Sequence, residues 1–302
     1  MSASFTIRPA RKEEVAAAAE LLNEHSRRLH GVDDQSASEL SQYWESPDVD
    51  FDRDVLVAQG PAGALVGYAD IGVLAGKVWL DVRGLEPAAL QDLLEAIEVR
   101  AAEKKPGAGL LAYISGEDDA IRDLYERTGY RVTRHSYRME IAVGGESPAP
   151  EWPDGIAVRT MRPGEEERVY EAQMTSFADT WMFGREPFDV WSHWMLGTPD
   201  FDPTLWFLAE AGDELVGISL TRESENEAGL GWVRILGVVP EFRQRGIAQS
   251  LLRHTFGEYA NRGLARVGLG VDAENPTGAV RVYEAAGMHV ARTNLILEKV
   301  EG

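Results

Sequence analysis

The sequence contains no cysteine among its 302 residues. A chain without cysteine cannot form a disulfide, a thiolate metal site or a cysteine nucleophile. No stretch approaches the roughly 20 apolar residues that a membrane-spanning helix needs, and the first residues lack the apolar segment of a secretory signal. We therefore expect a cytoplasmic protein that neither crosses nor binds a membrane.

Positive charge is scarce, because 30 Lys and Arg residues stand against 50 Asp and Glu residues, for a net charge of −20. Binding to nucleic acid in general needs a basic face, so we expect no nucleic-acid partner. An acidic surface is compatible with a cationic amine as substrate, although such surfaces more often serve solubility alone.

The chain divides at residues 143–155, a polar run that contains three prolines and three glycines and is typical of a linker. This predicts a first domain at residues 1–142 and a second at residues 156–302. The residues from Tyr130 to Val143 are expected to form the closing strands of the first domain.

The two halves contain the same short motifs in the same order, which indicates an internal repeat. Three pairs show it: Ile7-Arg8-x-x-Arg11 with Val158-Arg159-x-x-Arg162, Leu65-Val66-Gly67 with Leu215-Val216-Gly217, and Tyr125-Glu126-x-x-Gly129 with Tyr283-Glu284-x-x-Gly287. The separations of 151, 150 and 158 residues are nearly constant. We infer two copies of one α/β fold.

The most informative stretch runs from Trp232 to Gly287. Its pattern predicts a strand, a turn, a helix, a second strand and a second helix, at Val233–Val239, Glu241–Gly246, Ile247–Asn261, Leu264–Val271 and Thr277–Ala286. In the turn, Gly246 allows a ligand to approach the backbone, and the unpaired N–H groups of the helix start attract anions. With Arg243 and Arg245 beside it, the turn is suited to a phosphate or pyrophosphate. The alternative is an ordinary turn with solvated arginines.

The order of Arg243-x-x-Gly246-x-Ala248, Asn275 and Tyr283 resembles the signature of the GNAT superfamily of acyl-CoA-dependent N-acetyltransferases. The resemblance implies an α/β protein of two tandem GNAT folds, each a mixed, splayed β-sheet flanked by helices. The tandem layout is similar to that of the mycothiol synthases. The resemblance further implies that the second domain binds acetyl-CoA, without a metal, through these residues: Val238, Val239, Arg243, Gln244, Arg245, Gly246, Ile247, Ala248, Asn275 and Arg281.

The same resemblance implies direct acetyl transfer to a primary amine of a small, cationic molecule. Tyr283 stands where the family places the acid that protonates the leaving thiolate, and a purely structural tyrosine is the rival interpretation. Many relatives carry a carboxylate on the central strand as the base, but residues 231–234 contain none. Asp272 is a candidate base, although a turn or helix-capping role is the stronger alternative, and Asp179 and Glu223 are weaker candidates.

The segment after the first helix of the second copy is rich in tryptophan, and in the GNAT fold it covers the acceptor pocket. Aromatic rings there are able to hold a cationic amine. Asp179 and Trp181 are our candidates for lining this pocket, with packing in the core as the alternative for each tryptophan. We interpret His193 as a helix residue rather than a base.

The first copy lacks the features of the turn. At the separation of 158 residues, Gly246 aligns with Ala88, Arg245 with Pro87 and Gln244 with Glu86. A proline without an N–H and a carboxylate where a diphosphate would bind are both unfavourable. We therefore predict that the first domain does not bind acetyl-CoA in the usual way, and that it walls the substrate site, forms a homodimer or stabilises its neighbour.

Three other functions stay open at this point. One is a non-catalytic acyl-CoA-binding or sensor protein that kept the cradle but lost the base. Another is a protein N-acetyltransferase that acts on a protein N-terminus or lysine. The last is a structural protein with two degenerate copies, which would not bind coenzyme A at all.

Overall fold

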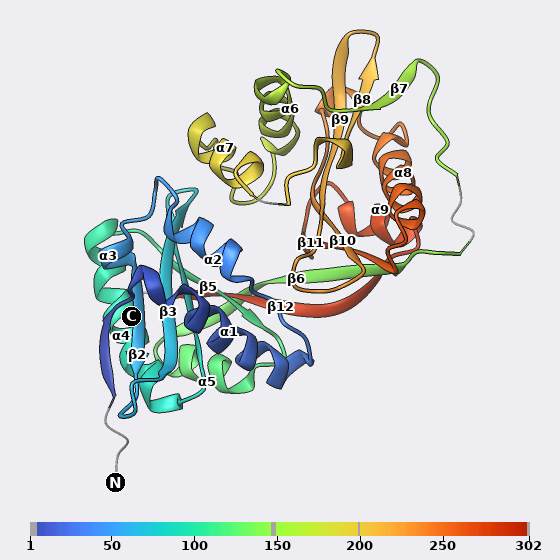
Figure 1. Ribbon diagram of the computed structural model, residues 1–302. Coiled ribbons are helices and arrows are strands. Elements are labelled where there is room, and N and C mark those ends of the chain that lie inside the picture. The colour runs from blue at the N-terminus through green and yellow to red at the C-terminus, as the bar shows by residue number, and fades with distance from the viewer. Residues whose placement is uncertain (1–4, 146–148, 199, 301–302) are drawn as a thin grey trace. The chain divides into compact units, whose positions relative to one another are not determined.

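The computed structural model describes residues 5–145, 149–198 and 200–300 (Figure 1). These residues fall into two compact units. Unit 1 consists of two separate segments, the residues up to His135 and those from Thr293 onward. Unit 2 comprises Ser136–Arg292. Across the described ranges, no helix combines the length and the apolar character that crossing a bilayer demands.

Unit 1 is built from elements of the first half of the chain and one strand from its end. In chain order these are β1 (Thr6–Pro9), η1 (Lys12–Glu14), α1 (Val15–His30), α2 (Ala37–Trp44), α3 (Phe51–Asp54), β2 (Val55–Gln59), β3 (Leu65–Leu74), β4 (Lys77–Gly84), α4 (Pro87–Lys104), β5 (Leu110–Ser115), α5 (Asp119–Arg127), the first part of β6 (Tyr130–Ala142) and the end of β12 (His289–Lys299). Its strands follow the order β1-β2-β3-β4-β5-β12.

Apart from the short 3₁₀ and one-turn helices, unit 2 has the same succession of elements. They are β7 (Ile156–Thr160), α6 (Glu166–Phe177), α7 (Phe188–Leu196), η2 (Pro203–Leu205), β8 (Trp206–Ala211), β9 (Glu214–Glu223), β10 (Leu230–Val238), η3 (Pro240–Phe242), α8 (Ile247–Asn261), β11 (Arg266–Asp272) and α9 (Ala279–Ala285). The strand order is β6-β11-β10-β9-β8-β7, so the last part of β6 closes this sheet.

Each sheet is mixed and splays where two neighbouring strands run parallel. In unit 1, β4 and β5 run parallel and stay paired only as far as Leu80 and Ala112. In unit 2, β10 and β11 part after Val233 and Leu269, next to a bulge in β10 between Val233 and Ile235. Extra residues of this kind bend a strand and increase its twist. The predicted fold of mixed, splayed sheets flanked by helices is confirmed.

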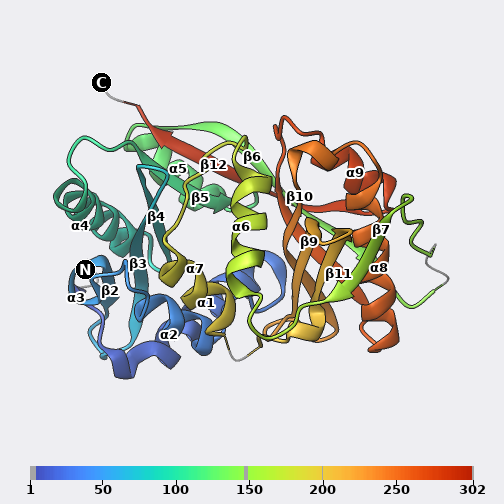
Figure 2. The same ribbon diagram turned by 90° about the horizontal axis from the view of Figure 1, so that it is seen from above.

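Helices cover both faces of the sheet in unit 2, with α6 and α8 on opposite sides (Figures 1 and 2). Alternate residues of β8 point to opposite faces. Trp206 and Leu208 pack with α6 and α7, whereas Phe207 and Ala209 pack with α8. Because both faces are buried, β8 is apolar at these successive positions rather than alternating apolar with polar residues.

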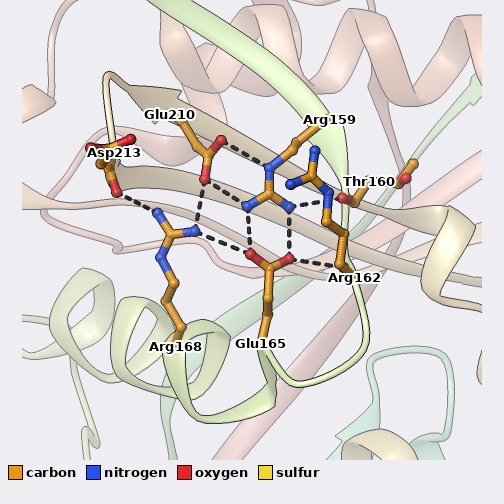
Figure 3. Close-up of polar contacts among 7 residues, drawn as sticks. All are labelled: Arg159, Thr160, Arg162, Glu165, Arg168, Glu210 and Asp213. Carbon is orange, nitrogen blue, oxygen red and sulfur yellow. Dashed lines mark hydrogen bonds and ion pairs between the residues drawn. The ribbon is translucent and has the colours of Figure 1, made fainter.

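The repeat extends to individual hydrogen bonds. In unit 2, the guanidinium of Arg159 bonds to both oxygens of Glu165 at 2.5 and 2.7 Å, and Glu165 accepts the backbone N–H of Arg162 at 2.8 Å (Figure 3). In unit 1, the guanidinium of Arg8 likewise donates hydrogen bonds to both carboxylate oxygens of Glu14, and Glu14 accepts the backbone N–H of Arg11 at 3.0 Å. All three pairs of positions are 151 residues apart.

The closing strands of the two units are exchanged along the chain. The residues from Tyr130 onward form one long strand, β6, rather than several closing strands, and its residues 136–142 pair with β11 of unit 2. The end of β12 pairs with β5 of unit 1. This grouping differs from the predicted domains at residues 1–142 and 156–302, because local sequence patterns do not reveal a strand's distant partner.

Candidate functional site

The turn between β10 and α8 has an unusual backbone. Gln244 and Gly246 both lie in the left-handed region, with φ of 62° and 83°. Residues with a Cβ rarely adopt this conformation. Glycine at position 246 adopts it without strain, whereas most other residues there would be strained. A Cβ built on Gly246 would meet no atom within 4 Å. The glycine therefore serves the backbone shape and leaves its outer face open.

Helix α8 begins directly after Gly246 with its first N–H groups exposed to this turn. Among the described residues no side chain caps the helix, and the first intrahelical bond runs from Ser250 N–H to Gly246 O at 3.0 Å. The N–H groups of Ile247, Ala248 and Gln249 precede that bond and have no partner within the helix. Together with the helix dipole they form a site for an anion.

A cavity of about 700 Å³ opens at this helix start, in the size range of small-molecule sites. Ten of the predicted site residues line it: Asp179, Val238, Arg243, Gln244, Gly246, Ile247, Ala248, Asn275, Arg281 and Tyr283. Sequence reasoning missed several others, among them Ser176, Phe177, Thr180, Leu236, Phe242 and Gln249.

Three predicted residues do not line this cavity. Val239 is 7% exposed and packs in the core under α8. The guanidinium of Arg245 lies 4.9 Å from the centre of the Phe242 ring. Trp181 lines a second, smaller cavity instead.

The edge of β10 that faces the splay is formed by Leu236 and Val238. Val239 donates its N–H to Val216 O on β9 at 3.0 Å, so its backbone faces β9. Successive residues of a strand turn their backbone groups to opposite sides. Leu236 and Val238 therefore face the gap between β10 and β11, whereas the predicted Val239 does not.

The side chain of Arg243 is held by protein atoms on three sides. Its Nε donates to Val238 O at 3.2 Å, its Nη2 donates to Ser176 O at 2.9 Å, and its guanidinium forms a two-pronged pair with Asp179 at 2.5 and 2.9 Å. The hydrogen bonds from Arg243 lower the pKa of Asp179. Arg243 thus connects the end of α6 to the turn. The sequence analysis expected Arg243 to hold a diphosphate and Asp179 to hold the acceptor, and it did not foresee that the two residues pair with each other.

Tyr283 lies where the large cavity meets the second one, of about 210 Å³, and lines both. The residue is 8% exposed, and burial raises the pKa of its phenol to about 12. A hydroxyl with this pKa keeps its proton through the neutral range and is able to donate it. The equivalent Tyr125 of unit 1 is fully buried, and its hydroxyl has no partner among the described residues.

Asp272 also lines the second cavity, at the end of β11, and its Oδ1 accepts the N–H of Glu274 at 3.1 Å. Arg234 from the bulge of β10 lines the same cavity. Asn275 lines both cavities while its Oδ1 accepts the N–H of Thr277 at 2.9 Å in the turn before α9. Of the two weaker candidate bases, Asp179 lines the large cavity, whereas Glu223 is 3.7 Å from Arg262 and is absent from the described lining of both cavities.

Unit 1 lacks the loop altogether. Leu85 donates to Val66 O just as Val239 donates to Val216 O, so Leu85 matches Val239. In unit 1 only Leu85 and Glu86 separate β4 from α4, whereas residues 239–246 separate β10 from α8. The alignment of Gly246 with Ala88 is therefore wrong. The loss is larger than we expected, because the whole segment that carries the left-handed turn is missing.

Within the described part of the chain, no group of three or more histidine or acidic side chains is placed to hold a metal ion. The candidate site contains the backbone N–H groups at the start of α8, the turn held by Arg243, the buried phenol of Tyr283, and the charged residues Arg234 and Asp272 in the lining of the second cavity.

Comparisons with known proteins show which family the chain resembles. A family model described as the acetyltransferase (GNAT) family matches residues 166–288. A mycothiol acetyltransferase of Streptomyces bingchenggensis is 31% identical over 267 residues, which cover 81% of this chain and 80% of the relative. A GCN5-related N-acetyltransferase from Sphaerobacter thermophilus has a TM-score of 0.77 and 32% identity, over 98% of this chain and 95% of that one.

The tandem layout has a counterpart among solved structures. A tandem GNAT protein from the clavulanic acid biosynthesis pathway matches 99% of this chain and 100% of its own, with a TM-score of 0.72. At 13% identity this likeness concerns the fold alone.

Proposed function

The chain belongs to the GNAT family of N-acetyltransferases, and from this premise we propose that unit 2 transfers an acetyl group from acetyl-CoA to the primary amine of a small molecule that is cationic in solution. The position of Tyr283 between the large cavity at the start of α8 and the smaller cavity beside it carries this proposal. The name of the relatives, mycothiol acetyltransferase, supports a small-molecule acceptor.

The residues around the large cavity fit acetyl-CoA, whose thioester supplies the activated acetyl group. The N–H groups at the start of α8 and the open face of Gly246 are suited to its diphosphate. Leu236 and Val238 present a strand edge to the splay, and an extended amide-containing arm can pair with such an edge. Asn275 and Arg281 line the same cavity and would border the bound molecule.

The chemistry then requires one proton to reach the departing sulfur. Tyr283 donates its phenolic proton there and regains one from the amine nitrogen as the new N–C bond replaces the C–S bond. Since the amine arrives as an ammonium ion, one further proton passes to water. Burial keeps the phenol protonated until it is needed, because it disfavours the phenolate.

A second candidate function is an acyl-CoA-binding sensor without turnover. One observation favours it: β10 carries Trp232 and Arg234 where many relatives hold a carboxylate base. Such a protein would keep the cradle at Gly246 and bind acetyl-CoA without passing the acetyl group to an amine.

Release of free coenzyme A across a panel of amines separates the two functions. We expect acetyl-CoA to raise the melting temperature of the chain, and at least one small amine to cause catalytic release of free coenzyme A. Binding without release for every amine would favour the sensor. A chain that acetyl-CoA does not stabilise would contradict both proposals.

A further inference from the structure

The two cavities of unit 2 adjoin at a neck, which we define as the residues that line both of them. These are Phe177, Thr180, Leu236, Asn275 and Tyr283. In the direct transfer proposed above, the carbonyl carbon of the acyl group is bonded to sulfur when the amine nitrogen attacks it. With coenzyme A in the large cavity and the amine in the smaller one, that carbon lies at the neck. The neck residues therefore contact the acyl group.

Two of the neck residues are apolar, and they reach it from opposite faces of the sheet. Leu236 packs with the core cluster under α8. Gly237, the next residue of β10, faces the other side, because successive residues of a strand alternate. A Cβ built on Gly237 would lie 3.2 Å from Cε2 of Phe177, the last residue of α6. The neck is thus bounded by an aromatic ring on one face and by a leucine side chain on the other.

The main chain around Phe177 is held by hydrogen bonds on both sides of this residue. Ser176 O accepts a bond from Nη2 of Arg243 at 2.9 Å. Phe177 O accepts the N–H of Thr180 at 2.9 Å and the hydroxyl of Thr180 at 2.7 Å. These bonds tie the last turn of α6 to the turn after β10, and they restrict how far the ring can move away from the neck.

The last turn of α6 also lies directly against the main chain of β10. A Cβ built on Gly237 would lie only 2.8 Å from the Cβ of Ser176, so a larger residue at position 237 would push the helix away. The ring of Phe177 is half-buried, and among the described residues of unit 2 it belongs to neither hydrophobic cluster. It therefore borders the cavities rather than filling the core.

We propose that the ring of Phe177, with Leu236 opposite it, limits the acyl chain to the length of an acetyl group. The proposal rests on the function proposed above for the place of the acyl group, and it adds the residues that select the acyl donor. Each further methylene of a longer chain has to displace a ring whose main chain is held on both sides. Forcing extra methylenes into a packed site is unfavourable, so longer acyl-CoAs bind more weakly.

Binding of acyl-CoAs of increasing chain length tests this in the unmodified protein without knowledge of the acceptor. Calorimetric titration in the absence of an amine gives the Kd of coenzyme A, acetyl-CoA, propionyl-CoA and butyryl-CoA. We expect the Kd to rise by about tenfold or more from acetyl-CoA to butyryl-CoA, as is typical when a pocket rejects an extra methylene. The Kd of coenzyme A reports the cradle and the arm alone.

The variant Phe177→Ala removes the ring and keeps the main-chain bonds of this residue. We expect it to bring the Kd of butyryl-CoA close to that of acetyl-CoA, with little change for coenzyme A. Phe242→Ala is the matched control, because Phe242 lines the large cavity and is absent from the described lining of the smaller one. It is expected to change the Kd of all acyl-CoAs alike. Phe177→Leu keeps an apolar side chain and is expected to give an intermediate result, and binding of coenzyme A verifies that each variant is folded.

The outcomes separate the acyl limit from the proposed function. Equal Kd values for all chain lengths in the unmodified protein would overturn the acyl limit, even where amines are acetylated. Discrimination that survives Phe177→Ala, or that Phe242→Ala removes equally, would also overturn it. Discrimination that depends on Phe177 without release of coenzyme A for any amine would instead refute acetyl transfer and leave the acyl limit in place.

Discussion

The exchange of Gly246 for aspartate or asparagine isolates the charge at the proposed diphosphate site. Both side chains have nearly the same size, and both tolerate the left-handed conformation better than other residues with a Cβ. Gly246 has φ of 83°, and a Cβ there meets no atom within 4 Å. The two variants are thus expected to share the same backbone cost and the same small loss of open space, and to differ only by one negative charge.

Stability and binding should change in opposite directions. A carboxylate at the start of α8 interacts favourably with the helix dipole, by about 0.3–1 kcal/mol. The same carboxylate repels each negative charge of a diphosphate about 5 Å away by about 3 kcal/mol at an effective dielectric constant of 20. This corresponds to a loss of at least two orders of magnitude in affinity. We therefore expect Gly246→Asp to be no less stable than Gly246→Asn and yet to bind acetyl-CoA at least a hundredfold more weakly.

Urea unfolding gives the free energy of unfolding, and calorimetric titration with acetyl-CoA at about 0.15 M salt gives the affinity, with charges screened as in the cell. Equal affinities for the two variants would refute the anion site at this turn. A loss of stability specific to aspartate would show that the start of α8 does not behave as an uncapped helix end.

Four further predictions concern other parts of the protein. Tyr283→Phe should lower kcat by about a hundredfold while the Kd of acetyl-CoA stays within about twofold. In the unmodified protein, the pKa of this phenol is about 12, so its ionisation should cause no fall in kcat below about pH 11. Unchanged kcat would assign Tyr283 to packing. Arg243→Lys cannot keep the two hydrogen bonds to the carboxylate of Asp179. We expect this variant to raise KM for the acceptor more than it raises the Kd of acetyl-CoA. A larger rise in the Kd of acetyl-CoA would contradict a structural role for the Arg243–Asp179 pair. Hydrogen bonds from Arg159 lower the pKa of Glu165 from 4.5 to about 2, so its contribution to stability is present above about pH 4.5 and is lost as the pH falls toward 2. Glu165→Gln should therefore lower the free energy of unfolding by about 1–3 kcal/mol at pH 7 and by progressively less toward pH 2, and an equal loss at both pH values would refute the assignment. Finally, a chain that begins at residue 143 lacks β6. In this chain we expect the amides of residues 270–272 to exchange faster with solvent than those of α8. Slower exchange at residues 270–272 than in α8 would contradict the supporting role of β6.

Much of the second unit was predictable from sequence because its signals are local. The helix predicted at Ile247–Asn261 has these bounds in the structure, and the glycine at its start is left-handed. The helix predicted at Thr277–Ala286 is shorter, at Ala279–Ala285, because Asn275 and Thr277 form a turn before it. The apolar periodicity of a helix and a glycine just before its first residue are local features of the sequence. Both can therefore be recognised in a single chain.

The parts that sequence reasoning missed depend on distant partners. Arg243 lines the large cavity as predicted, but the sequence did not show that its guanidinium pairs with Asp179, a residue 64 positions away. The bulge that brings Arg234 to the cavity depends on the register between β9 and β10. Alternation in β6 predicts a strand without naming its neighbour, and so the exchange with β12 was not foreseen.

The last part of β6, which comes from the first half of the chain, supports the end of β11 in unit 2. Beyond Leu269, β11 has parted from β10, so its residues Gly270–Asp272 pair on one side only, with Arg138, Tyr137 and Ser136 of β6. A strand end paired on neither side would expose all its backbone groups and would not hold its shape. Asp272, which lines the proposed acceptor cavity, therefore depends on a strand encoded in the first half of the chain. We therefore expect the removal of β6 to loosen this wall of the cavity.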